Sequence, residues 1–184
     1  GDLNEVGTNA TYDDGEWLVA EADESDGTFL ALDPEAALIT NVEADHLEHF
    51  GGLEQLIDSF RTFADGVDTP LVCCADDPVA HDIARERGGV TYGFSESADY
   101  HGVDYQGGGN GSRLRVVRSS GSGSEELGGI ELPVPGHHNA LNALGATAMA
   151  LEIGVPFPAV SQALGRFGGV ARRFQFRGER EGVT

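Results

Sequence analysis

The sequence predicts an α/β domain with a mainly parallel central sheet, flanking helices and a small antiparallel hairpin sheet. Between residues 36 and 94, apolar runs of strand length alternate with helical patterns, as in parallel sheets that helices cover. Between about residues 100 and 134, short β-prone pieces are separated by glycine- and serine-rich turns, which is typical of antiparallel hairpins. A chain of 184 residues, of which 40% are hydrophobic, fits one globular domain over residues 1–184.

In the first half of the chain, strands are expected where short apolar runs end in polar residues. The run 17–20 ends in an acidic stretch, and the run 36–40 ends in a polar one, so both are interpreted as buried strands. Apolar residues at helical spacing predict a helix over 53–64. The expected order then continues with a strand over 71–74, a helix that Asp77 and Pro78 open and that runs to Arg87, and a strand over 90–94.

In the second half, the expected hairpin strands cover 103–106, 113–118 and 130–134. A helix is expected next, because the apolar residues that follow form one stripe that ends before Gly154. Its cap is expected to be His138 or Asn139. That stripe consists of Leu141, Leu144, Ala148 and Leu151. A last helix is expected over about 158–167, stopped by two glycines.

Composition disfavours several classes of function. With 11 basic against 31 acidic residues, the net charge of -20 repels nucleic acids and anionic membrane surfaces. All the basic residues are arginine, which excludes a Walker A lysine from this chain. Neither a signal peptide nor a membrane span is recognisable, so a soluble, cytoplasmic protein is expected.

Two further features concern the origin of the chain. The adjacent Cys73 and Cys74 are interpreted as buried thiols in a reducing cytosol, because neighbouring cysteines seldom satisfy disulfide geometry. The chain begins at Gly1, and its only methionine is Met149. We therefore expect a piece of a longer protein.

Acidic residues follow two of the expected parallel strands. Glu21 opens a loop of four carboxylates within six residues, and Asp45 with His46 follows the next strand. Ligands gather beyond the carboxyl ends of parallel strands, and clustered carboxylates repel one another unless a cation screens them. The pattern indicates a Mg²⁺ or Mn²⁺ site. The alternatives are a solvated acidic loop and a structural histidine.

A second candidate site lies at the start of the helix near residue 138. Asn139 and Asn142 are one helical turn apart, beside Gly136, and side-chain amides can hydrogen-bond a heterocycle such as adenine. The alternative is that Asn139 caps the helix and Asn142 is merely exposed. Further on, Arg172 and Arg173 could bind phosphates or form surface ion pairs.

Taken together, four segments resemble the central domain of the Mur ligases, and most of all the branch that joins L-alanine to UDP-N-acetylmuramate. They cover residues 17–30, 40–47, 136–142 and 167–174, in the order and spacing of that family. The resemblance implies that Glu21 and His46 bind catalytic Mg²⁺. It also implies that Asn139 and Asn142, with His138 beside them, face the adenine and ribose of ATP, and that Arg173 reaches the phosphates. Arg172, Asp45 and Asn41 match less firmly.

The resemblance also implies a reaction. The γ-phosphoryl group of ATP passes to the lactyl carboxylate of UDP-N-acetylmuramate, and the amine of L-alanine then attacks the acyl phosphate, a step of peptidoglycan synthesis. The family has three domains: one for the UDP group, a central ATP-binding domain and one for the amino acid. Its lysine-containing phosphate loop would precede Gly1, so the chain alone is expected to be inactive.

Departures from the family pattern leave alternatives open. Gly145 interrupts the family's alanine-rich helix, at an expected cost of about 1 kcal/mol in helix propensity. The parent could instead be the ligase that recycles murein tripeptide, although the segment 40–46 fits that enzyme less well. A non-catalytic nucleotide-binding or scaffold domain is the alternative from another class.

Overall fold

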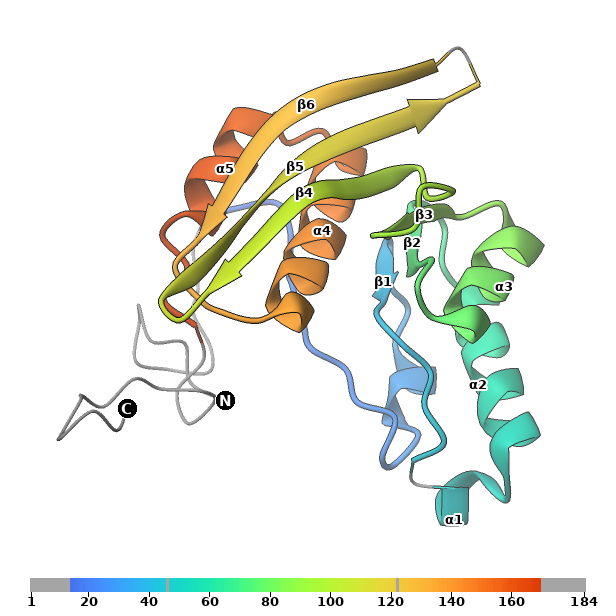
Figure 1. Ribbon diagram of the computed structural model, residues 1–184. Helices are drawn as coiled ribbons and strands as arrows, with labels where there is room; N and C mark the ends of the chain where they lie inside the picture. The colour runs from blue at the N-terminus through green and yellow to red at the C-terminus, as the bar shows by residue number, and fades with distance from the viewer. Residues whose placement is uncertain (1–13, 46, 122, 170–184) are drawn as a thin grey trace, which may run out of the picture.

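The computed structural model describes residues 14–45, 47–121 and 123–169, and these form an α/β fold around one six-stranded sheet (Figure 1). The strands lie side by side in chain order, from β1 to β6. Neighbouring strands from β1 to β4 are parallel, whereas β4, β5 and β6 are antiparallel. The strands are β1 (Ala37–Ile39), β2 (Leu71–Cys74), β3 (Val90–Gly93), β4 (Tyr100–Gly108), β5 (Gly111–Ser120) and β6 (Gly123–Leu132). The predicted α/β fold class is therefore confirmed.

Helices cover both faces of this sheet. Figure 1 shows α2 and α3 on one face and α4 and α5 on the other. The helical elements are the 3-10 helix η1 (Thr28–Ala31), α1 (Leu47–Phe50), α2 (Leu53–Asp65), α3 (Pro78–Arg87), α4 (His137–Glu152) and α5 (Phe157–Leu164). No helix among the residues described is both long and apolar enough to cross a membrane.

Local signals set the bounds of α3 where the sequence predicts them. The side chain of Asp77 accepts a hydrogen bond of 2.7 Å from the Ala80 amide, which caps the helix. Pro78 occupies the first helical position, where its missing N–H costs nothing. Gly88 ends the helix in the left-handed conformation, at φ 68°.

The antiparallel strands differ from the prediction in length and in setting. They form no separate sheet, because Tyr100 of β4 pairs with Tyr92 of β3 and makes the sheet continuous. Glycines and serines expected to form turns instead lie within β4, β5 and β6, where Gly107 pairs with Ser112. A ladder of backbone hydrogen bonds to neighbouring strands outweighs the low strand propensity of these residues.

Two helix bounds and one strand also differ. The helix α4 begins at His137 after Gly136, with no side-chain cap, so capping by His138 or Asn139 is wrong. The helix α5 ends at Leu164, before Gly165. The strand expected over 17–20 is absent: Leu18 and Val19 are 93% and 90% exposed. A strand needs a neighbouring backbone to pair with, and the described residues place none beside this run.

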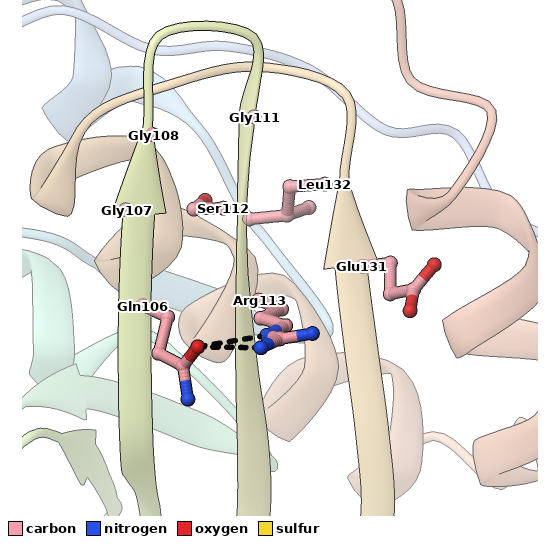
Figure 2. Close-up of a pocket in the computed structure, with 8 residues that line it drawn as sticks. All are labelled: Gln106, Gly107, Gly108, Gly111, Ser112, Arg113, Glu131 and Leu132. Carbon is pink, nitrogen blue, oxygen red and sulfur yellow. Dashed lines mark hydrogen bonds between the residues drawn. The ribbon is translucent and has the colours of Figure 1, made fainter.

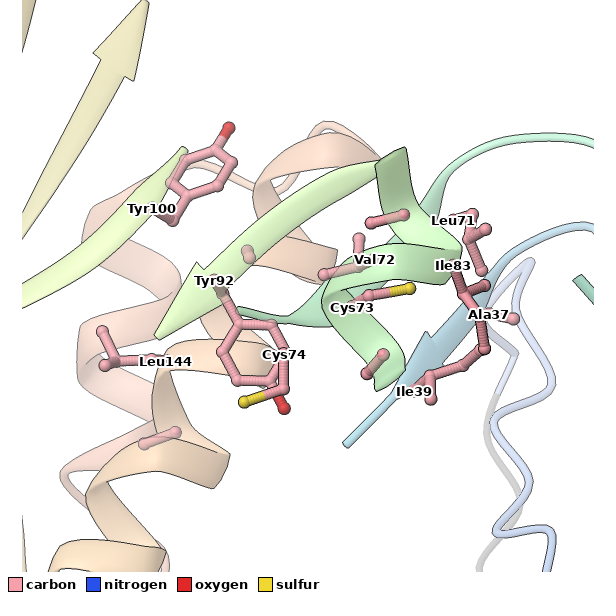
Figure 3. Close-up of a cluster of buried hydrophobic side chains, with 14 of the residues drawn as sticks. Ala37, Ile39, Leu71, Val72, Cys73, Cys74, Ile83, Tyr92, Tyr100 and Leu144 are labelled. Atoms are coloured by element: carbon pink, nitrogen blue, oxygen red, sulfur yellow. The ribbon is translucent and has the colours of Figure 1, made fainter. Parts of the chain in front are cut away.

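The core lies on both faces of the parallel strands, where α3 contributes Ile83 and α4 contributes Leu144 (Figure 3). Cys73 and Cys74 are buried and unpaired, as predicted, and burial raises the pKa of Cys73 to about 12. Both are therefore inert thiols at neutral pH.

The ring of Tyr92 is completely buried and lies against Gly145, where an added Cβ would be 2.7 Å from the ring. Gly145 thus makes room for Tyr92, a role that its helix propensity alone does not reveal.

Candidate nucleotide and metal site

The candidate site lies at the carboxyl ends of the parallel strands. β1 leads directly into the segment that contains Asn41 and Asp45. Phe94 follows the last residue of β3, and its ring stacks on His137, the first residue of α4, with centroids 4.2 Å apart. The first turn of α4 therefore stands at the same edge of the sheet. Ligands of open parallel sheets bind at this edge.

Part of the acidic loop after residue 20 is used to build a turn. Asp23 accepts a hydrogen bond of 2.7 Å from the Ser25 amide. Asp26 accepts hydrogen bonds from the hydroxyl and the amide of Thr28, at 2.6 and 3.0 Å, and these bonds hold the pKa of Asp26 below its usual value. Glu21 precedes this turn and is exposed. Two of the four carboxylates therefore shape the loop, an arrangement that the charge pattern alone does not reveal.

The second polar segment lies beside this loop. A Cβ at Gly27 would be 2.9 Å from Nε2 of His49, so the turn touches α1. Upstream, the Asn41 amide donates a hydrogen bond of 3.0 Å to Glu43, and the Asp45 N–H donates one of 2.8 Å to the Glu43 carbonyl. The two polar segments that the sequence singles out are thus neighbours in space.

The metal site itself stays a prediction. Within 14–45, 47–121 and 123–169, no three His, Cys, Asp or Glu side chains gather where they could hold a metal ion. His46, one of the two expected ligands, lies outside the described residues. The carboxylates of this region are hard oxygen donors, and that chemistry fits Mg²⁺.

The first turn of α4 presents polar side chains at the same edge. The Asn139 amide nitrogen donates a hydrogen bond of 2.6 Å to the Pro135 carbonyl, so Asn139 fastens the helix to the preceding loop. Its amide oxygen can still accept a hydrogen bond. His138 and Asn142 are exposed. Asn142 follows Asn139 by three residues, so both lie on one helix face, and this face can meet a nucleotide base.

Two expected phosphate-binding residues cannot be placed. Arg172 and Arg173 lie outside the described residues, and their roles stay predictions.

Three rings at this edge were missed by sequence reasoning. Tyr105 of β4 lies edge-on to His137, with centroids 5.2 Å apart, and to Phe94, at 5.7 Å. We call Phe94, Tyr105 and His137 the ring cluster. No local sequence signal could have found it, because the three residues come from three separate elements.

A hollow of about 340 Å³ lies elsewhere, at the ends of the antiparallel strands (Figure 2). At its side, Nη2 and Nε of Arg113 donate hydrogen bonds of 2.6 and 3.1 Å to Oε1 of Gln106. None of the predicted site residues lines this hollow.

Comparison with known proteins decides the family. The family model described as Mur ligase middle domain matches residues 2–150. The chain belongs to this family. Two of its relatives are proteins named UDP-N-acetylmuramate–L-alanine ligase, from Methylorubrum extorquens and from a Bradyrhizobium species. Each is 45% identical to this Mur ligase middle domain over all of the chain and 41% of the relative.

Solved structures agree on the fold. UDP-N-acetylmuramate-alanine ligase MurC from Thermotoga maritima matches 86% of this Mur ligase chain and 35% of its own, with 29% identity and a TM-score of 0.73. MurF from Acinetobacter baumannii matches with 21% identity and a TM-score of 0.69, which is a likeness of fold alone. The chain therefore spans less than half the length of the curated relatives it matches.

Proposed function

We propose that the protein containing this chain is a cytoplasmic, ATP-dependent ligase that joins L-alanine to UDP-N-acetylmuramate. One observation supports this most strongly: relatives with 45% identity over the whole chain carry that name. This chain would form most of the central domain. The remaining domains of the same protein would bind the nucleotide sugar and the amino acid.

The residues at the carboxyl edge of the sheet receive distinct roles in this proposal. His138, Asn139 and Asn142 would contact the adenine and ribose of ATP, and Arg173 would pair with its phosphates. Glu21 and His46 would hold Mg²⁺. When bound there, the ion would neutralise charge on the nucleotide phosphates.

The chemistry needs anions brought together and water kept away. A lactyl carboxylate oxygen of UDP-N-acetylmuramate attacks the γ-phosphorus of ATP, and ADP leaves. The amine of L-alanine then attacks the acyl carbon, loses a proton and displaces inorganic phosphate, so that an amide bond forms. Arg173 would lower the repulsion between the carboxylate and the phosphates.

The test is phosphate release by the full-length protein with Mg-ATP and UDP-N-acetylmuramate. L-alanine, glycine, L-serine and murein tripeptide are compared as acceptors. We expect turnover that requires both the nucleotide sugar and L-alanine. Turnover with the tripeptide alone would identify the recycling ligase instead, and ATP binding without turnover would favour a scaffold. The isolated chain is the matched control and should release no phosphate, because it contains no lysine for a phosphate loop.

A further inference from the structure

The ring cluster joins the start of α4 to the strands of the sheet. The imidazole of His137 stacks on Phe94 at 4.2 Å, with 29° between the ring planes, and meets Tyr105 at 83°. These are the stacked and edge-to-face geometries that aromatic pairs favour. His137 is nevertheless exposed, whereas Phe94 and Tyr105 are half-buried. The cluster therefore lies at the surface of the site, and His137 is not part of the buried core.

Phe94 is held in place from two sides. Its backbone amide and that of Ser95 donate hydrogen bonds to the two carboxylate oxygens of Asp76, at 2.7 and 2.9 Å. Its ring lies over Gly102, where an added Cβ would be 2.9 Å from Cε1 of the ring. The ring is thus a fixed surface for His137 to stack on.

On the helix side, the contact involves the first turn of α4. Gly136 has φ +105°, a positive value that favours glycine. Because glycine carries no side chain, α4 begins without a side-chain cap. The amides of Asn139 and Ala140 donate hydrogen bonds to the Gly136 carbonyl, at 3.1 and 3.2 Å. The turn is also held by the Asn139 side chain on the Pro135 carbonyl and by the buried Ala140. His137 adds the aromatic contact with Phe94 and Tyr105 on the exposed side of the turn.

We propose that His137 is a positioning residue for ATP, which fixes the first turn of α4 on Phe94 and Tyr105 so that His138, Asn139 and Asn142 are presented to the nucleotide. This inference rests on the proposed function, because it concerns the same site. A helix start that moves freely would pay an ordering cost each time a nucleotide binds, and a start already fixed avoids that cost.

The experiment measures the dissociation constant of Mg-ATP by calorimetry on the full-length protein and its variants. We expect His137→Ala to weaken binding about fivefold, the order of magnitude of one aromatic contact. His137→Phe keeps a ring on Phe94 and should stay within about twofold of the unchanged protein. Ser161→Ala removes a hydrogen bond of 2.8 Å to the Gly129 carbonyl on another part of the sheet and is the control for general destabilisation. It should leave ATP affinity unchanged.

Hydrogen exchange provides the second measurement. The Ala140 amide should exchange faster in His137→Ala and at the normal rate in His137→Phe. If the dissociation constant of Mg-ATP for His137→Ala stays within about twofold of that for the unchanged protein, this inference is overturned and the proposed function is not. Equal weakening by Ala and Phe would overturn it too, because the imidazole would then contact the nucleotide directly. A full-length protein that binds no ATP would overturn the proposed function together with this inference.

Discussion

Replacing Glu21 by Gln in the full-length protein is expected to lower kcat about a hundredfold or more. Glutamine keeps the size of the side chain and removes the negative charge. If Glu21 holds Mg²⁺, the charge on the reacting phosphates is then poorly balanced. Affinity for Mn²⁺, measured by electron paramagnetic resonance, should fall about tenfold or more in the same variant.

Glu24→Gln is the matched control for this prediction. It removes the same charge from the same loop, where the Glu24 backbone carbonyl accepts a hydrogen bond of 3.0 Å from the Gly27 amide. That bond survives the substitution, so the turn should keep its shape. Glu24 is half-buried and has no assigned contact with the reacting groups, so we expect activity within about twofold of the unchanged protein. Equal losses in the two variants, or unchanged Mn²⁺ affinity in Glu21→Gln, would contradict the role given to Glu21.

Gly145→Ala is expected to destabilise the protein by up to about 2 kcal/mol, against the usual preference for alanine in helices. Alanine gains about 1 kcal/mol of helix propensity. The new methyl group, however, would lie 2.7 Å from the Tyr92 ring, and that ring is completely buried. Overpacking of this kind costs about 1–3 kcal/mol, so the clash outweighs the gain. Urea unfolding measures the difference in free energy.

The neighbouring position provides the control with the opposite sign. Ala146 is exposed on α4, so Ala146→Gly tests propensity without packing. It should destabilise by about 1 kcal/mol. Glycine is then unfavourable at position 146 and favourable at position 145, one residue away. A Gly145→Ala variant more stable than the unchanged protein would show that Tyr92 moves aside at little cost.

Elements with local signals could be predicted from the sequence almost residue by residue. Asp77 caps α3, Pro78 starts it and Gly88 ends it, and each acts through its own backbone or side chain. The strand β2 was likewise bounded by its apolar run. Such signals need no knowledge of the rest of the chain.

Elements that depend on distant partners could not be predicted. The apolar run 17–20 has the pattern of a strand, but no strand among the described residues lies beside it. The glycine-rich ends of β4 and β5 have the pattern of turns and become strands because they pair with each other. Gly145 is explained only by Tyr92, which lies 53 positions earlier in the chain.

The candidate site divides in the same way. The two polar segments and the start of α4 were singled out from the sequence pattern, and their roles stay predictions. In the structure, Asn41, Asp45 and the start of α4 lie at the carboxyl edge of the parallel strands, and Gly27 of the acidic loop lies close to His49 of α1. The sequence pattern did not indicate that Asp26 accepts hydrogen bonds from Thr28, or that Asn139 donates one to Pro135, although the partners are close in the sequence. It also could not indicate the ring cluster, because those contacts depend on the folded arrangement of β3, β4 and α4.

The most direct test of the central claim follows oxygen from the carboxylate to phosphate. UDP-N-acetylmuramate labelled with ¹⁸O at both lactyl carboxylate oxygens is turned over by the full-length protein with Mg-ATP and L-alanine, and the products are analysed by mass spectrometry. If an acyl phosphate forms, one labelled oxygen appears in inorganic phosphate and the other stays in the amide product. Unlabelled phosphate, or label in AMP, would contradict ligation through an acyl phosphate and with it the function proposed for this domain.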